Sequence, residues 1–284
     1  MAGPLLAVDT PYLLFRAAFS LPESITDGEG RPVNALLGTA NALLQVVEER
    51  APRAVVLCFG EEAADYRVAL YPAYHAHREP MPDPLARQFD DAPEFFAAFG
   101  WPSLSEPGLE ADDVLGALAA AETAAGGETL LMTGDRDMFQ CVGDRVTVLY
   151  AAQSKGGPAV IDADEVRQRY GVGPELVPDF IALRGDPSDG LPGGKGIGEK
   201  TAADLLRRHG SLEGAIANAL TEPPRVRGSL REQADELRAF KEIATLRPVH
   251  VERPPDQALD RAGAAAAARA RGMNRLAARL DPDG

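Results

Sequence analysis

The chain has 284 residues, of which 45% are hydrophobic and 25% charged, as in an ordinary globular protein. No apolar run is long enough to span a bilayer, and the N-terminal segment lacks the basic start of a signal peptide, so we expect a cytoplasmic protein that meets no membrane. Two cysteines, Cys58 and Cys141, are too few for a disulfide framework or a zinc site. The net charge of −14 argues against nucleic acid as a partner, unless many of the acids belong to one metal site.

Short apolar runs predict four strands, at residues 4–9, 53–60, 128–137 and 145–150. Near-continuous apolar sequence is typical of strands buried on both faces. Segments with helical spacing, at residues 34–50 and 111–125, lie between them. This alternation predicts an α/β fold with a mainly parallel central sheet flanked by helices. Ligands of such sheets bind beyond the carboxyl ends of the strands.

From about Val172 the sequence changes to helical segments joined by short glycine or proline turns. We expect helices at residues 174–184, 199–208, 211–219 and 229–246, one more helix in the alanine-rich tail, and a strand candidate only at 247–252. These patterns predict an α/β core over residues 1–170 and a helical region over 171–284. Residues 65–100 carry five prolines and little periodicity, which indicates a long excursion from the core.

Acidic residues gather where the predicted strands end and at the start of one helix. Each cluster taken alone is also typical of a helix cap, and that alternative stays open for "EADD" (110–113) and "GDRD" (134–137). Eight acids at one end of a sheet would repel one another severely unless cations neutralise them or some stay protonated. Oxygen ligands favour Mg²⁺ or Mn²⁺ over zinc, and their number suggests two ions about 4 Å apart, as in phosphate-ester hydrolysis. The eight acids are Asp9, Glu110, Asp112, Asp113, Asp135, Asp137, Asp186 and Asp189.

The segment "GGKGIGEKTA" (193–202) predicts a turn that holds an anion. Gly196 and Gly198 let the backbone approach a phosphate, and the helix that follows points its N–H groups at it. Lys195 and Lys200 add positive charge. Metal ions lying between the acids of "GDPSD" (185–189) and a bound phosphodiester would explain why carboxylates stand beside an anion-binding turn.

At these residues the sequence resembles the 5′-nuclease family, which includes flap endonucleases, phage 5′–3′ exonucleases and the N-terminal nuclease domain of bacterial DNA polymerase I. The resemblance runs from about residue 5 to 252 and is carried, in the family's order, by "LLAVD", "LEADDVLG", "LMTGDRDMFQ", "ALRGDPSDGLPGGKGIGEKTA" and "RHGSLE". It implies a DNA-binding helix–hairpin–helix-type motif and, because the polymerase part is absent, a stand-alone bacterial exonuclease.

The resemblance also implies the roles of individual residues. Asp9, Glu110 and Asp112 match the acids around a first divalent ion, with Asp113 in the same motif. Asp135, Asp137, Asp186 and Asp189 match those nearer a second ion. Arg16 matches a residue that contacts the scissile phosphate, Arg78 matches an arginine of a helical arch (here residues 65–100), and a potassium ion is expected near Gly196–Gly198. The expected DNA contacts are Arg16, Arg67, His75, Arg78, Lys195, Gly196, Gly198, Lys200 and Thr201.

The implied activity is metal-dependent 5′–3′ exonucleolytic and flap-endonucleolytic cleavage of DNA by a monomer. Two departures from the family pattern bear on it. Gly60 stands where the family has an aspartate, with Glu61 as the nearest substitute ligand, and His75 stands where the arch has a lysine. A DNA-structure-binding protein with weakened catalysis is therefore an alternative hypothesis, and a metal-dependent RNase is a third.

Overall fold

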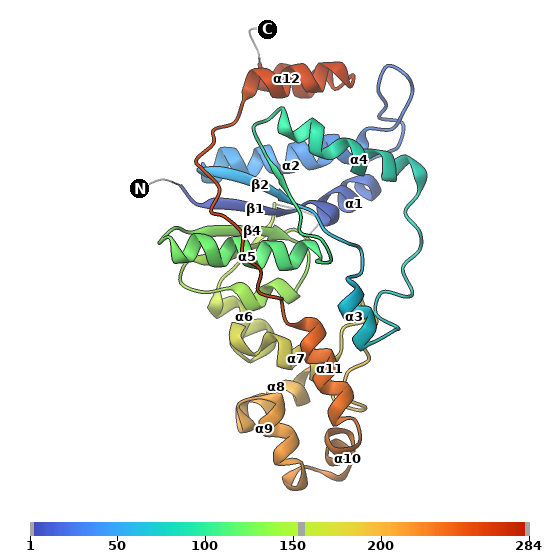
Figure 1. The fold of residues 1–284 in the computed structure, drawn as a ribbon, viewed down its shortest axis with the longest axis vertical. Coiled ribbons are helices and arrows are strands. Elements are labelled where there is room, and N and C mark those ends of the chain that lie inside the picture. Colours follow the sequence, from blue (N-terminus) through green and yellow to red (C-terminus); the bar gives the residue numbers. More distant parts are fainter. Residues whose placement is uncertain (1–2, 153–156, 282–284) are drawn as a thin grey trace.

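The computed structural model describes residues 3–152 and 157–281. Its central sheet has the strand order β3-β2-β1-β4-β5-β6, in which every neighbouring pair is parallel except β5 with β6 (Figure 1). This confirms the α/β prediction. The strands β3 and β6 are too short to give a clear sequence pattern. The strands are β1 (Leu5–Asp9), β2 (Ala54–Cys58), β3 (Ser103–Leu104), β4 (Thr129–Thr133), β5 (Val146–Tyr150) and β6 (Ala159–Ile161).

Helices cover both faces of this sheet, which explains the continuous apolar sequence of its strands (Figure 1). In β1, Leu5 and Ala7 pack into one core, whereas Leu6 and Val8 pack into the other. The first core contains residues of α5 (Ala111–Ala124), α6 (Ala163–Tyr170) and α7 (Val177–Arg184). The second contains residues of α1 (Thr10–Ser20), α2 (Asn34–Arg50), α4 (Asp83–Ala97), α12 (Arg261–Ala270) and α13 (Asn274–Leu280).

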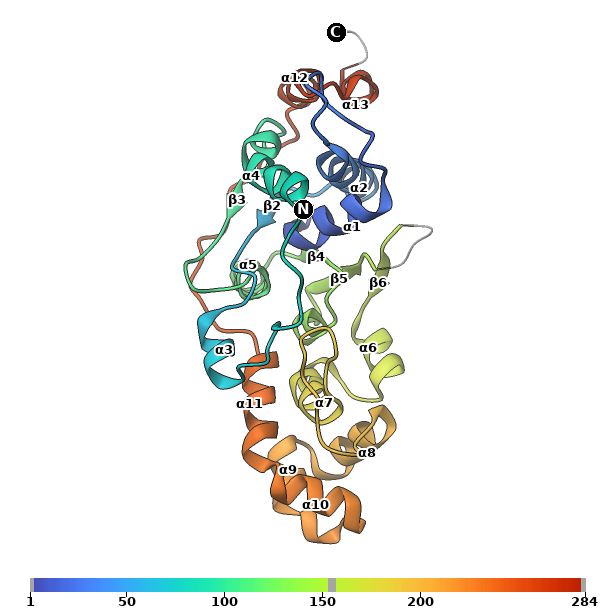
Figure 2. The same ribbon diagram turned by 90° about the vertical axis from the view of Figure 1, so that its right-hand side faces the viewer.

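A group of short helices extends away from the α5 side of the sheet. The helix α12 lies at one end of the molecule, and this group forms the other end (Figures 1 and 2). The helix α11 returns from this end and packs against α7. The elements of this region are η1 (Asp137–Cys141), η2 (Pro174–Leu176), α7, α8 (Glu199–His209), α9 (Leu212–Ala217), η3 (Ala219–Thr221), α10 (Pro224–Glu232) and α11 (Ala234–Ala244).

Three predictions about these C-terminal elements were wrong. The helix expected at 229–246 is two helices, α10 and α11, which are separated at Gln233. The single tail helix is also two, α12 and α13, because Gly272 between them adopts a left-handed conformation with φ 71°. Residues 247–252 form no strand.

The segment 65–100, expected to leave the core as an arch, does so only in its first half. The helix α3 (Asp65–Leu70) stands away from the sheet beside α11, and the chain from Tyr71 to Pro82 leads from α3 to α4 (Figures 1 and 2). The helix α4 instead packs on α1 and α2, with Phe95 and Phe96 fully buried. The sequence pattern hid this because α4 carries Pro93 inside it.

None of the helices within residues 3–152 and 157–281 is long and apolar enough to cross a membrane.

Candidate active site

The acidic residues of the strand ends meet where β1 lies between β2 and β4, the point at which the strand order reverses. Asp9 ends β1, and its carboxylate accepts hydrogen bonds from the Tyr12 amide at 3.0 Å and the Thr133 hydroxyl at 2.7 Å. Thr133 ends β4 and so joins the two strand ends. Crevices at such a reversal are the usual ligand sites of parallel α/β sheets.

A cavity of about 1070 Å³ opens at this edge of the sheet. Its lining also includes the aromatic side chains of Tyr12, Phe15, Phe59 and Phe89. Sequence reasoning did not find these aromatic residues, because only Tyr12 and Phe15 share an element, α1, whereas Phe59 and Phe89 come from distant segments. The cavity brings together all the expected metal ligands except Asp113, namely Asp9, Glu61, Glu110, Asp112, Asp135, Asp137, Asp186 and Asp189.

Some of these carboxylates have a cationic or histidine partner. Glu110 lies 3.1 Å from the Arg67 guanidinium and also accepts hydrogen bonds from Tyr74 and the Ala64 amide. Asp186 lies 3.1 Å from the Arg184 guanidinium. Asp189 lies 3.1 Å from the His75 ring. These three side chains are held in place.

The other four acids of the strand and helix ends form no ion pair with any described residue. Burial, the largest influence, raises the pKa of Asp9, Asp112 and Asp137 above the usual range of an aspartate. Burial and the nearby charge of Asp189 raise the pKa of Asp135 to about 7. Ionised carboxylates in such a place need a compensating cation.

The donor chemistry of this cavity fits a divalent cation, because the groups it offers are carboxylate oxygens and four of these carboxylates form no ion pair with a described residue. The expected two-ion geometry is not assembled, however. Within residues 3–152 and 157–281, no three histidine, cysteine, aspartate or glutamate side chains are arranged so that they could hold an ion. Binding metal in this cavity would therefore require the carboxylates to move toward one another.

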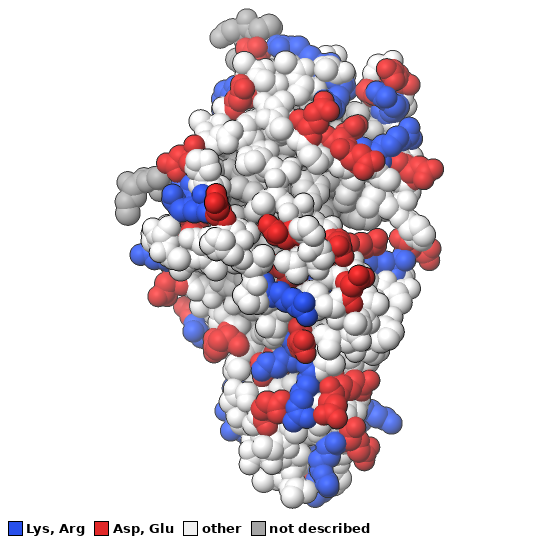
Figure 3. Space-filling view, viewed as in Figure 1, with Lys and Arg blue, Asp and Glu red and all other residues white. Residues whose placement is uncertain are grey.

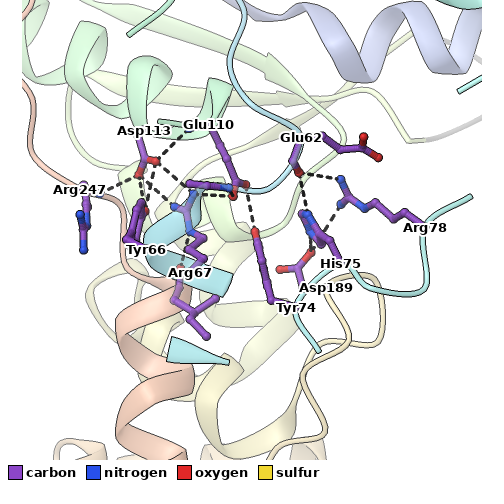
Figure 4. Close-up of polar contacts among 12 residues, drawn as sticks. Glu62, Tyr66, Arg67, Tyr74, His75, Arg78, Glu110, Asp113, Asp189 and Arg247 are labelled. Atoms are coloured by element: carbon purple, nitrogen blue, oxygen red, sulfur yellow. Dashed lines mark hydrogen bonds and ion pairs between the residues drawn. The ribbon is translucent and has the colours of Figure 1, made fainter. Parts of the chain in front are cut away.

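Asp113 is not a ligand candidate in this structure, which corrects the expectation from the sequence. Its side chain is fully buried and accepts hydrogen bonds from Nη1 and Nη2 of Arg67, at 3.1 and 3.0 Å, and from the Arg247 amide at 2.8 Å (Figure 4). It also accepts from the Glu110 amide at the start of α5, so the helix-cap reading of "EADD" holds for this residue.

Arg67 requires a second correction. It was expected to contact DNA, but its side chain is only 4% exposed. Its guanidinium bridges Asp113 and Glu110, and its Nε donates to the Ile243 carbonyl (Figure 4). Arg67 therefore acts inside the protein as a support for Glu110.

Gly60 leaves no room for the aspartate that the family pattern places there. A Cβ atom at Gly60 would lie 2.4 Å from the Ala111 nitrogen, because the chain after β2 passes directly against the start of α5. Glu61 lines the cavity, and its carboxylate accepts a hydrogen bond from the Gly108 amide at 3.0 Å. The glycine is thus required by backbone packing, and Glu61 is held at the cavity rim.

The arch places His75 and Arg78 beside the acids. His75 is buried with a left-handed backbone, φ 54°, and its ring lies between the Glu62 carbonyl at 2.8 Å and Asp189 (Figure 4). Arg78 is 39% exposed and lies 3.9 Å from Asp189.

Arg16 lies one helical turn beyond Tyr12 on α1 and is not part of the cavity lining.

The glycine turn before α8 lies outside the cavity lining. Gly196 has φ 79°, a conformation that favours glycine, and Gly198 precedes the first residue of α8. Lys195 and Lys200 are exposed, and Thr201 is half-buried at the start of α8. In the same segment of chain, Asp186 and Asp189 line the cavity, so the acids and the glycine turn face different surroundings.

Comparison with known proteins agrees with this arrangement. The sequence model described as "5′-3′ exonuclease, N-terminal resolvase-like domain" matches residues 4–171, and "5′-3′ exonuclease, C-terminal SAM fold" matches residues 172–262. The chain belongs to this 5′–3′ exonuclease family of nucleases. It is 36% identical to a 5′-3′ exonuclease of Mycobacterium tuberculosis over 90% of the chain and 89% of that protein.

Two further similarities concern a longer protein and the fold. The chain is 38% identical to the thermostable DNA polymerase I of Thermus thermophilus over 92% of its own length, but spans only 31% of that polymerase. Its fold is similar to the T5 D15 protein co-crystallised with metal ions, with a TM-score of 0.71, 16% identity and coverage of 98% and 97% of the two chains. It is also similar to the catalytic core of Rad2 in complex with DNA substrate, with a TM-score of 0.62, 13% identity and coverage of 98% and 93%.

Proposed function

We propose that this chain is a divalent-metal-dependent 5′–3′ exonuclease and 5′-flap endonuclease that acts on DNA as a monomer in the cytoplasm, in replication or repair. The observation that supports this most is a set of four carboxylates at the carboxyl edge of the sheet that form no ion pair with a described residue, namely Asp9, Asp112, Asp135 and Asp137. Such a set is stable in its ionised form only with bound cations. The metal ions crystallised with the T5 protein and the DNA bound to Rad2 accord with this proposal.

The residues of the cavity would have three roles: binding a first ion, binding a second ion and binding the scissile phosphate. Asp9, Glu110 and Asp112 would hold one Mg²⁺ or Mn²⁺ ion, with Glu61 as a candidate further ligand, and Asp135, Asp137, Asp186 and Asp189 would lie around a second. Such ions neutralise charge that develops on a reacting phosphate and activate the attacking water. Arg78 of the arch extends toward the same acids and would bind the scissile phosphate, as would Arg16 on α1.

The protein groups around Glu110 are arranged before any ligand binds. Arg67, Tyr74 and the Ala64 amide fix the Glu110 carboxylate before any ligand binds. Phe15, Phe59 and Phe89 add apolar surface to the lining of the cavity. Together these groups would orient a phosphodiester bond between the acids and the arch.

The test is cleavage of a 5′-flapped duplex, labelled at either end of the flap strand, with Mg²⁺, Mn²⁺ or a chelator. Release of the flap and of 5′-terminal products, dependent on the metal and lost in Asp135→Ala, would support the proposal. Binding of the same DNA without cleavage at any metal concentration would overturn it.

That second outcome would favour a DNA-structure-binding protein with lost catalysis. The observation on its side is Gly60, whose position cannot carry the acid of the family pattern. Cleavage of RNA but not DNA would favour the RNase hypothesis instead.

A further inference from the structure

The glycine turn and α10 form one surface, which we call the hairpin–α10 surface (residues 193–200 and 224–233). A Cβ atom at Gly196 would lie 2.1 Å from Nε of Arg225, so the Arg225 side chain rests directly on the turn. The Lys195 amide donates to the Gln233 side chain at 2.8 Å. A Cβ atom at Gly194 would lie 3.0 Å from the Ser229 hydroxyl. The turn therefore lies along one side of α10 at three successive positions.

This surface carries basic side chains without a carboxylate partner. Arginines nearby are neutralised, as Arg207 is by Asp204 and Arg208 by Glu222. By contrast, five cations of the hairpin–α10 surface form no ion pair or side-chain hydrogen bond with any residue that the structure describes. They are Lys195, Lys200, Arg225, Arg227 and Arg231, and all but the half-buried Arg227 are exposed.

These five cations stand in a chain whose net charge is −14. On the face shown in Figure 3, acidic and basic side chains are interspersed rather than gathered into a broad basic field. The acids Glu199 and Glu232 also belong to the hairpin–α10 surface, so its positive charge is local. A local strip of cations beside an exposed glycine turn fits a regularly charged backbone, as in duplex DNA.

The potassium ion expected at the turn does not fit beside Arg225. The guanidinium already places a positive charge against Gly196, and a second cation there would be repelled. We propose that Arg225 supplies the cation of the hairpin, so that this chain binds the duplex backbone through the hairpin–α10 surface without potassium. This rests on the proposed function, because it takes DNA as the ligand.

The experiment measures binding of a labelled blunt duplex, longer than one helical turn, by fluorescence anisotropy in a chelator. Titrations in KCl and in LiCl at equal ionic strength should give the same Kd for the wild type. Arg225→Gln should weaken binding several-fold and lower the slope of log K against log salt by about 1, because one phosphate contact is lost. Arg225→Lys, which keeps the charge, should keep most of the slope.

The matched control is Arg261→Gln. Arg261 is exposed, has no ion pair with a described residue, and lies on α12 at the opposite end of the molecule (Figure 1), so its change should leave Kd and slope unaltered. Tighter binding in KCl than in LiCl, an unchanged slope in Arg225→Gln, or no duplex binding by the wild type would each overturn the inference. The binding assay contains no divalent metal and is therefore independent of cleavage. If Arg225 contributes to duplex binding but the protein does not cleave flapped DNA when metal is added, only the proposed function is contradicted. If the protein cleaves flapped DNA but Arg225→Gln changes neither the Kd nor the salt slope of duplex binding, only this inference is contradicted.

Discussion

Arg67 and Asp113 form a two-pronged ion pair inside the protein, with Nη1 3.1 Å from Oδ2 and Nη2 3.0 Å from Oδ1. The pair joins the arch helix α3 to the start of α5, and the same guanidinium reaches Glu110. The ring of Tyr66 closes this cluster, with Arg247 stacked 3.3 Å from its centre (Figure 4). An arginine suits this place because its planar fork serves two carboxylates at once.

We therefore expect Arg67→Ala to lower the free energy of unfolding by about 3–5 kcal/mol, because it strands the buried Asp113 carboxylate. Urea denaturation measures this. The control is Arg78→Ala, where a partly exposed arginine is removed and the expected loss is under about 1 kcal/mol. Normal stability of Arg67→Ala, together with weaker DNA binding, would instead return Arg67 to the DNA-contacting residues.

Asp135→Ala or Asp189→Ala should abolish cleavage while leaving the affinity for flapped DNA within several-fold. Each change removes a proposed metal ligand needed in the transition state, whereas the hairpin contacts remain. Single-turnover cleavage and anisotropy on the same DNA separate the two effects. Full nuclease activity in either variant would contradict the two-metal assignment.

The pH dependence of stability offers a test that needs no substrate. The pKa of Asp135 is raised from 3.8 to about 7 in the folded protein, so between these two pH values the folded state holds a proton that the unfolded state has lost. Stability from this group is therefore complete below pH 4 and is lost as the pH rises toward 7.

In a chelator, the wild type should thus lose more stability between pH 5 and pH 8 than Asp135→Asn, measured by Tm. Added Mg²⁺ at pH 8 should raise the Tm of the wild type more than that of the variant, because the ion compensates the ionised carboxylate. Identical pH profiles for both proteins would show that Asp135 has no unfavourable charge to relieve.

Glu61→Gln tests whether the neighbour of Gly60 binds metal. The amide oxygen of glutamine can still accept from the Gly108 amide, so the loop should be preserved while the charge that holds a hard cation is lost. If Glu61 is a ligand, activity should fall strongly and recover in part at higher metal concentration. Equal activity and metal affinity in the two proteins would leave the first ion to Asp9, Glu110 and Asp112.

Gly60→Asp restores the acid of the family pattern and should fail to improve activity. Its Cβ atom would lie 2.4 Å from the Ala111 nitrogen, and overpacking of this kind costs about 1–3 kcal/mol. Gly108→Ala is the control for glycine replacement nearby, since a Cβ atom there meets nothing within 4 Å, although its φ of 75° adds strain of its own. A stable and more active Gly60→Asp would show that the backbone adjusts readily to an acid.

The sequence by itself determined the fold class and the acids that surround the cavity. An apolar run fixes where a buried strand lies, and parallel strands bring their carboxyl ends to one edge, so Asp9, Asp135 and Asp137 had to meet. Asp186, Asp189 and the glycine turn were likewise recognisable, because their spacing is local. The domain division and the roles of the site residues other than Asp113 and Arg67 remain predictions.

The tertiary structure alone decided which way neighbouring residues face. Asp112 and Asp113 are adjacent on α5, where successive side chains point about 100° apart, so one lines the cavity and the other is buried against Arg67. The Gly60 contact with Ala111, and that of Gly196 with Arg225, join segments distant in sequence. No periodicity records such contacts, because they arise only when separate elements pack together.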